Sequence, residues 1–151
     1  ANFAPYLLER AQIYMNNDQA RNAMLDYDAY YKAVNGQVND LFYYYREQAA
    51  LKARQYQRAL DDIVKAVELS PKDLTYRAEH AVVNLRVGRY EESMKILNEI
   101  LKDEPKYGEA YRLLGLCQIQ LKKTDEACGN FNKAKELGDP NVDELIKKYC
   151  K

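Results

Sequence analysis

A 34-residue period constrains the fold of this chain more than any other feature of its sequence. Pro71 and Pro105 lie 34 residues apart, and each closes a similar stretch, Ala-Val-Glu-Leu-Ser-Pro and Ile-Leu-Lys-Asp-Glu-Pro. A small residue and a large one recur at the same phase of successive units, in the pairs Ala59 and Ile63, Ser93 and Leu97, and Ala127 and Phe131. Such a period indicates stacked structural repeats, each of which buries its apolar face against the next.

Each unit is predicted to be a pair of helices. Residues of the third unit recur at helical spacing in both halves, at Ala78, Ala81, Val82 and Leu85 and again at Met94, Leu97 and Leu101. Gly88 stands between the two halves, where the chain must turn. We therefore expect one all-α, right-handed α-solenoid over residues 1–151, with hairpins at about 4–37, 40–73, 74–107 and 108–141 and a capping helix at about 141–150.

The repeat resembles the tetratricopeptide repeat (TPR), a helical hairpin of 34 residues. The fourth unit carries the family pattern best, with Tyr111, Leu114, Gly115, Ala127, Phe131 and Ala134. The second unit departs from it at Glu47, which occupies the position usually held by glycine, and the first unit is the most degenerate. The resemblance implies a protein-binding scaffold that presents a concave groove to an extended or helical segment of a partner protein.

Composition and charge exclude several other classes of function. Lys plus Arg and Asp plus Glu each number 23, so no basic field is available for nucleic acid. No apolar run is long enough for a membrane span. The sequence has no phosphate-binding loop or metal-ligand cluster, and its one histidine, His80, is expected to pack in a helix pair. We expect neither an enzyme nor a cofactor.

The resemblance places the partner groove on the first helix of each hairpin. The matching residues are Leu8, Gln12, Asn16, Tyr44, Gln48, Lys52, Ala78, Val82, Arg86, Arg112, Leu116 and Gln120. Lys52, Arg86 and Arg112 would meet carboxylates of the partner. An alternative is that the apolar members pack between helices, and a second alternative is a structural or assembly module that uses its exposed helices for subunit or self-association.

Two local patterns refine this groove. In the run from Tyr43 to Tyr45, the repeat register assigns Tyr43 to the hairpin interior, Tyr44 to the groove as its anchor and Tyr45 to a flank. Repeats that grip chaperone tails use Lys, Asn and Arg as a carboxylate clamp. The matching positions here hold Leu8, Gln12, Tyr45, Thr75 and Glu79, so we expect no chaperone-tail clamp.

The C-terminal residues are predicted to form a cap. Asp139 or Asn141 could begin a short helix whose apolar side, Val142, Leu145, Ile146 and Tyr149, covers the last hairpin. Cys128 and Cys150 lie eleven residues before and after Asp139, so antiparallel helices would bring both thiols to the same height. Two interpretations stay open, a disulfide between them or two reduced, half-buried thiols, whereas Cys117 is expected to be a buried free thiol.

The sequence around Cys128 and Cys150 bears on the cellular compartment in which the protein is expected. The stretch from Ala127 to Cys150 is similar to the last repeat of exported tetratricopeptide proteins of Bacteroidetes-type bacteria, which favours a periplasmic or otherwise exported protein. A cytoplasmic protein is the alternative. The chain begins with Ala1 rather than Met, which leaves open whether a leader or further repeats precede it.

Overall fold

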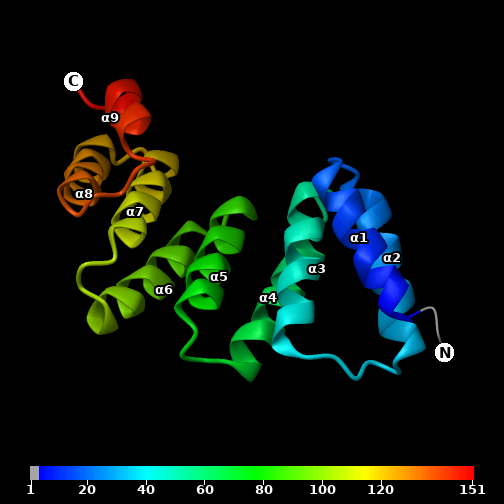
Figure 1. Ribbon diagram of the computed structural model, residues 1–151. Coiled ribbons are helices and arrows are strands. Elements are labelled where there is room, and N and C mark those ends of the chain that lie inside the picture. Colours follow the sequence, from blue (N-terminus) through cyan, green and yellow to red (C-terminus); the bar gives the residue numbers. More distant parts are fainter. Residues whose placement is uncertain (1–3) are drawn as a thin grey trace. The chain divides into compact units, whose positions relative to one another are not determined.

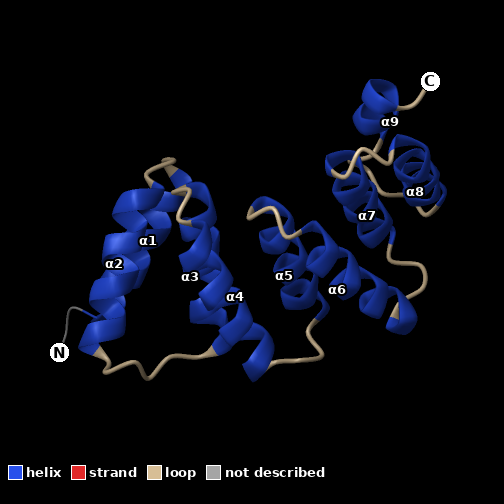
Figure 2. Cartoon of the chain, turned by 180° about the vertical axis from the view of Figure 1, so that it is seen from behind, coloured by secondary structure: helices blue, strands red, loops and turns tan. Residues whose placement is uncertain are grey.

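The computed structural model describes residues 4–151, and every regular element in that range is an α-helix (Figure 1; Figure 2). The helices are α1 (Ala4–Asn16), α2 (Ala20–Ala33), α3 (Asp40–Lys52), α4 (Tyr56–Leu69), α5 (Leu74–Arg86), α6 (Tyr90–Asp103), α7 (Gly108–Gln120), α8 (Thr124–Glu136) and α9 (Asp143–Tyr149). Four of them, α1, α3, α5 and α7, begin at the first residues of the four predicted units. The prediction of an all-α fold of paired helices is confirmed.

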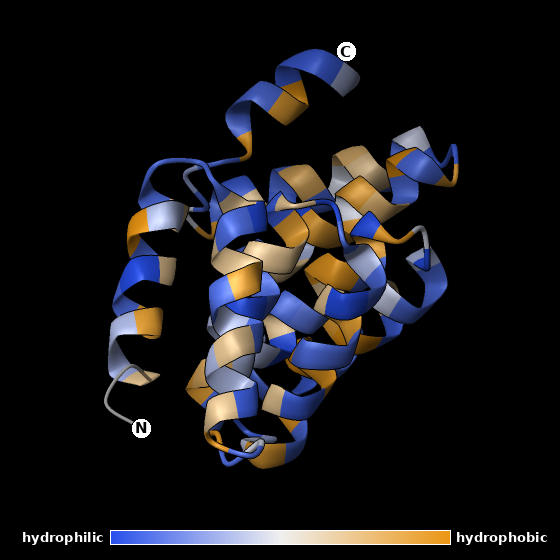
Figure 3. Ribbon diagram, turned by 90° about the vertical axis from the view of Figure 1, so that its right-hand side faces the viewer, coloured by the Kyte–Doolittle hydropathy of each residue, from blue (hydrophilic) through white to orange (hydrophobic). Residues whose placement is uncertain are grey.

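The chain divides into two compact units, one that ends at Tyr76 and one that begins at Arg77. The first holds the hairpins α1/α2 and α3/α4, and the second holds most of α5 together with α6 to α9. Hydrophobic and hydrophilic positions alternate along the helices (Figure 3), as expected for helices that bury one side.

The turn inside each hairpin contains one residue in the left-handed region. These residues are Asp18, Arg54, Gly88 and Lys122, with φ between 57° and 83°. The left-handed conformation brings Cβ close to the following carbonyl oxygen, which costs a residue other than glycine about 1–2 kcal/mol. Gly88 therefore suits its turn, whereas Arg54 and Lys122 occupy equivalent turns with strain.

Exchanging residue types at these turns is expected to change stability in opposite directions. Lys122→Gly should raise the free energy of unfolding by about 0.5–1 kcal/mol, and Gly88→Ala should lower it by about 1 kcal/mol. Urea denaturation of each variant measures both changes. Gly129→Ala is the matched control, because Gly129 lies inside α8 with open space around its Cα and should gain stability from alanine's helix propensity. A loss of stability in Lys122→Gly would contradict the assignment of backbone strain to Lys122.

Small residues let the two helices of a hairpin approach closely. A Cβ on Gly115 of α7 would lie 2.3 Å from Cε1 of Phe131, which is fully buried on α8. In the third hairpin the hydroxyl of the buried Ser93 donates a hydrogen bond of 2.7 Å to the carbonyl oxygen of Ala81. Serine is thus accommodated at a position where the family has alanine.

The C-terminal helix covers the last hairpin as predicted. Val142 is buried with Ala127, Phe131 and Ala134, and Leu145, Ile146 and Tyr149 pack against this cluster. A disulfide joins Cys128 of α8 to Cys150, with their Cα atoms 5.7 Å apart, and Cys117 is a buried free cysteine. Of the two open interpretations, the structure adopts the disulfide.

The predicted cap of α9 was wrong. Val142 is the N-cap residue, and it makes no side-chain cap hydrogen bond. Asp139 lies earlier in the turn, where its Oδ1 accepts a hydrogen bond from the backbone N–H of Asn141 and its Oδ2 lies 3.0 Å from Nε of Arg112. A buried ion pair with α7 therefore takes the carboxylate that we expected at the helix start.

Candidate partner-binding surface

Two adjoining cavities lie between α1 and α3 in the first unit. The larger measures about 670 Å³ and is lined by Leu8, Gln12, Tyr27, Tyr30, Gln37, Val38, Asn39, Leu41, Phe42 and Tyr45. The smaller measures about 260 Å³ and is lined by Gln12, Met15, Asn16, Tyr27, Tyr44, Tyr45, Gln48 and Lys52. The two share Gln12, Tyr27 and Tyr45, so we treat them as one surface and call it the α1–α3 groove.

Helical periodicity explains why these side chains meet. Leu41, Tyr45, Gln48 and Lys52 recur at intervals of four, three and four residues, which places them on one face of α3. Leu8 and Gln12 are likewise one turn apart on α1. Six predicted groove residues lie in the first compact unit, which ends at Tyr76, and each of them lines one or both cavities. They are Leu8, Gln12, Asn16, Tyr44, Gln48 and Lys52.

The assignment of Tyr45 to a flank was wrong, because this side chain lines both cavities. Tyr44 lines only the smaller cavity, and its ring packs 5.3 Å from that of Tyr76 and 5.7 Å from that of Tyr45. The four-residue spacing from Leu41 to Tyr45 could have identified this position, but the repeat register gave Tyr44 priority. The cavities thus have two tyrosines on α3.

Aromatic rings and amides dominate the larger cavity. The ring of Phe42 stacks 5.6 Å from that of Tyr30 and meets that of Tyr27 edge-on at 5.8 Å. Burial raises the pKa of Tyr27 to about 12, so its hydroxyl stays protonated at neutral pH. Gln37 and Asn39 contribute amides from the loop before α3, and none of the residues 4–151 that line this cavity is charged. It can accept apolar groups and neutral hydrogen-bonding groups.

The opposite end of the groove is basic. A third cavity, of about 320 Å³, lies at the turns of the first two hairpins and shares Lys52 with the smaller groove cavity. Its charged lining residues are Arg21, Lys52, Arg54 and one acid, Asp18. Nζ of Lys52 lies 3.6 Å from Oδ1 of Asp18, and both side chains are exposed. An ion pair this open to water contributes little stability and leaves both groups accessible.

A repeated ion pair inside the first unit was missed by the sequence analysis. Arg10 on α1 binds Asp26 on α2 through two hydrogen bonds of 2.7 Å. Arg46 on α3 binds Asp62 on α4 in the same way, at 2.8 and 2.9 Å. The signal was present, because arginine and aspartate stand 16 residues apart in both hairpins. In the third and fourth hairpins the arginine positions are occupied by His80 and Leu114.

Arg46 also joins the two hairpins. Its guanidinium lies 4.9 Å from the ring centre of Tyr31 and 3.3 Å from the carboxylate of Asp28, both on α2. Its side chain is only 13% exposed. Burial is the largest single influence on Arg46 and opposes its ionisation, but the hydrogen bond to Asp62 and the negative charges of Asp62 and Asp28 together outweigh it and raise the pKa of Arg46. These contacts hold α2 against α3, and therefore support the walls of the α1–α3 groove.

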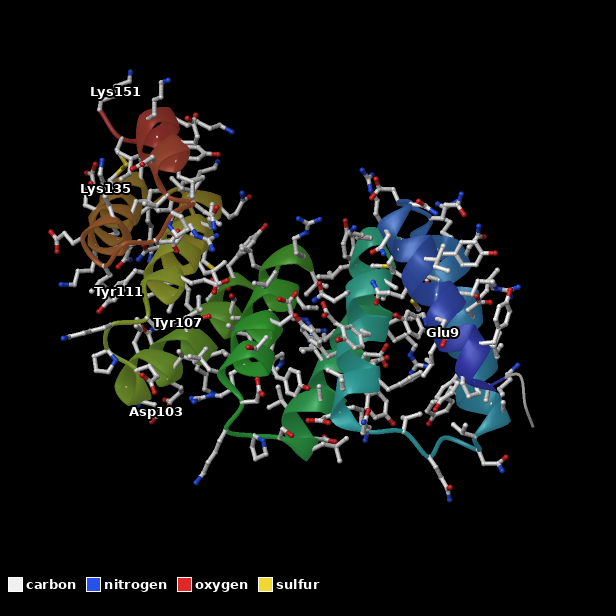
Figure 4. The ribbon with its side chains drawn as sticks, in the orientation of Figure 1. Glu9, Asp103, Tyr107, Tyr111, Lys135 and Lys151 are labelled. Carbon is white, nitrogen blue, oxygen red and sulfur yellow. A yellow bond between two sulfur atoms is a disulfide. The ribbon has the colours of Figure 1, made fainter. Side chains whose placement is uncertain are left out.

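Two predicted groove residues in the second compact unit, which begins at Arg77, are corrected. Ala78 is 4% exposed and belongs to the core, so its side chain is not available to a partner. Arg112 is not a free cation: its side chain is 16% exposed, and it pairs with Asp139 and with Glu109. Val82 and Leu116 are half-buried, and Arg86 and Gln120 are exposed. Figure 4 labels Tyr107, the residue just before α7, and Tyr111 within α7.

The second unit contains the one histidine of the sequence, His80, and a buried free cysteine, Cys117. His80 is half-buried on α5, and its burial lowers the pKa of the imidazole although Glu92 opposes that shift. Burial raises the pKa of the Cys117 thiol and keeps it protonated. Within residues 4–151, no cluster of three or more His, Cys, Asp or Glu could hold a metal ion. No helix in that range is both long and apolar enough to cross a membrane.

Curated relatives match about two thirds of the chain. The small glutamine-rich tetratricopeptide repeat-containing protein 2 of Mycosarcoma maydis is 29% identical over 99 residues, which cover 66% of this chain and 28% of that protein. The heat shock protein STI1 of Saccharomyces cerevisiae is 31% identical over 101 residues, or 64% of this chain and 17% of that protein. The chain thus spans less than a third of the length of these relatives.

Solved structures show the same fold at low identity. YrrB, described as a TPR protein with an unusual peptide-binding site, has a TM-score of 0.81 at 19% identity and covers 96% of this chain and 74% of its own. The first TPR of Spaghetti (RPAP3), bound to the HSP90 peptide SRMEEVD, has a TM-score of 0.64 at 21% identity. The match covers 74% of this chain and 87% of that one. These neighbours agree with the predicted solenoid class of helical hairpins.

Family models span most of the helical hairpins. The model of the anaphase-promoting complex, cyclosome, subunit 3 matches residues 16–100, and a tetratricopeptide repeat model matches residues 79–142. Both matches fall on the paired helices described above, with the small residues Ala59, Ala81 and Ala127 buried where the helices meet. The 34-residue period, the helical hairpins and these matches together show that the chain belongs to the tetratricopeptide repeat family.

Proposed function

We propose that this protein is a non-enzymatic scaffold that binds a segment of a partner protein in the α1–α3 groove. The observation that carries the proposal is the convergence of the six first-unit residues, Leu8, Gln12, Asn16, Tyr44, Gln48 and Lys52, on two adjoining cavities. Their combined surface is concave and rich in aromatic rings and amides. Tyrosine provides a large contact area at a low entropy cost, which suits the anchor of a protein interface.

The relatives support a role in protein binding without defining the partner. RPAP3 binds an HSP90 peptide and YrrB is described as having a peptide-binding site. In this chain Leu8, Gln12 and Tyr45 occupy positions at which chaperone-tail clamps carry Lys or Asn, and all three line the larger cavity. We therefore propose a partner other than a chaperone tail held by such a clamp.

Selection from a displayed library of random 12-residue peptides tests this function. The protein is expected to enrich peptides whose affinity falls at least tenfold in Tyr45→Ala, because this truncation removes ring surface from both cavities. Tyr6→Ala is the matched control, since Tyr6 is an exposed tyrosine of α1 that lines neither cavity. If no peptide is enriched, or if both variants bind equally to those recovered, the groove is not the binding site.

Self-association is the second candidate function. It is favoured by Ile13 on α1 and Leu25 on α2, large apolar side chains that are more than half exposed. Sedimentation velocity over a hundredfold range of concentration separates the candidates, because a scaffold that binds foreign segments should stay monomeric. We also propose that the protein works in an exported, oxidising compartment, a proposal supported by the Cys128–Cys150 disulfide.

A further inference from the structure

We propose that the α1–α3 groove, if it binds a partner as inferred above, selects an extended segment with a bulky apolar side chain at one end and acidic side chains at the other. The inference rests on the proposed function and adds the chemistry of the partner. It follows from the uneven distribution of charge along α3. Among the described residues, those that line the larger cavity carry no charge, whereas the cavity beyond Lys52 is lined by three cations and one acid.

The neutral end has the room and the apolar walls to receive a bulky side chain. Its volume of about 670 Å³ lies within the range of pockets that enclose a drug-sized ligand, so it has room for a bulky apolar side chain together with the backbone beside it. Leu41 and Tyr45 are exposed there, and the stacked rings of Tyr30 and Phe42 form a wall that is already packed. A charged side chain would lose its hydration in this cavity without gaining an opposite charge. An aromatic or branched aliphatic side chain fits it best.

The basic end attracts carboxylates. Arg21, Arg54 and Lys52 come from three separate places, the start of α2, the turn after α3 and the last residue of α3. Cations spread over a surface in this way suit two or three acidic side chains better than a single chain terminus. We therefore assign this end to Asp and Glu side chains of an internal segment. Asp18, whose carboxylate lies 3.6 Å from Nζ of Lys52, competes with them for the same cation.

The separation of the two ends fixes the spacing in the partner. A helix rises about 1.5 Å per residue, so Leu41 and Lys52 lie about 16 Å apart along α3. An extended chain advances about 3.3 Å per residue, and about five residues cover that distance. The partner segment should thus carry its first acidic residue four or five positions from its apolar residue.

A defined peptide tests this chemistry directly. The probe is acetyl-Phe-Ser-Gly-Ser-Asp-Glu-Asp-amide, titrated into the protein and followed by backbone amide chemical shifts. We expect shifts on α1 and α3, and affinity losses of about tenfold when lysines replace the acids and when serine replaces the phenylalanine. A free C-terminal carboxylate on a peptide without acidic side chains should not restore binding.

Charge variants of the protein provide the reciprocal test. Lys52→Glu should weaken the acidic peptide about tenfold, and Asp18→Asn should strengthen it severalfold because the competing carboxylate is removed. Lys65→Glu is the matched control, since Lys65 is an equally exposed lysine on α4 outside the three cavities. Asp18→Asn keeps a residue type that tolerates the left-handed turn at this position, so its folding should be unaffected.

The outcomes separate this inference from the function on which it rests. Tyr45-dependent peptides without acidic residues, together with a defined peptide that does not bind, would overturn the inference and leave the scaffold function standing. Absence of any Tyr45-dependent peptide would overturn both. A concentration-dependent dimer that Tyr45→Ala abolishes would assign the groove to a second copy of this chain and would also overturn the inference.

Discussion

Replacing Arg46 with alanine is expected to lower the free energy of unfolding by about 3–5 kcal/mol, the largest effect of any single substitution considered for this protein. The side chain of Asp62 is 6% exposed and receives two hydrogen bonds from Arg46. Without the guanidinium, its carboxylate would remain buried with no opposing charge in contact. The variant would also lose the packing of Arg46 on the rings of Tyr31 and Phe42. Urea denaturation at neutral pH measures the loss.

The pH dependence of this loss identifies its cause. Burial raises the pKa of Asp62 even in the presence of Arg46, and removal of the cation should raise it further. A carboxyl group with a raised pKa binds its proton more readily in the folded state, so stability rises as the pH falls through that raised pKa towards the ordinary pKa of the unfolded chain. The destabilisation in Arg46→Ala should therefore be smaller near pH 4 than at pH 7.

Two further variants act as controls for Arg46. The double variant Arg46→Met with Asp62→Leu should recover much of the stability, because it removes both buried charges and fills their volume. Arg10→Ala removes the equivalent cation of the first hairpin, whose side chain is 39% exposed, and water can replace it at a smaller cost. Equal losses in Arg10→Ala and Arg46→Ala would show that burial of the cation has no influence on the result.

Reduction of the Cys128–Cys150 disulfide is expected to lower the free energy of unfolding by about 3 kcal/mol. The bond closes a loop across 22 residues, and the chain-entropy model gives a stabilisation of this size for such a loop. The helix that it holds, α9, has only seven residues and makes no side-chain N-cap hydrogen bond. Hydrogen exchange at Leu145 and Ile146 should accelerate on reduction, while exchange in the first unit should not change.

Thiol counting verifies the redox state in this experiment. Alkylation of the unreduced, denatured protein followed by intact mass measurement should detect one thiol, that of Cys117. Cys117→Ala is the control variant, and its response to reductant should match that of the parent protein. Three reactive thiols in protein taken from its native host would contradict both the bond and the proposed oxidising compartment. An unchanged urea midpoint on reduction would show that α9 docks without the bond.

Much of the fold could be predicted because its determinants are local and repeated. Gly115 and Phe131 share a phase with Ala81 and Leu97 one period earlier, and the structure places each of these four residues in helices that pair. The apolar stripe of α9 was equally readable, since four residues at helical spacing are enough to orient a short helix. The N-cap of α9 could not be predicted in this way, because Asp139 forms an ion pair with Arg112 of α7.

The sequence likewise predicted only part of the binding surface. The helical register placed Gln12, Gln48 and Lys52 on first helices, and these residues do line the groove cavities. The register could not show that Tyr45 also turns into them, or that Ala78 and Arg112 turn towards partners within the chain. Such choices depend on which side chains surround each position after the hairpins pack.

The sequence alone determined the period, the helix pairs and the family, because each follows from residue types at fixed intervals along one chain. The tertiary structure decided which charges are used internally. It buried Arg46 between Asp62 and Tyr31 and left Lys52 exposed at the end of the same helix. In the sequence, Arg46 and Lys52 are two cations six residues apart with nothing to distinguish their roles. Those roles depend on distances to groups that only the packed hairpins bring together.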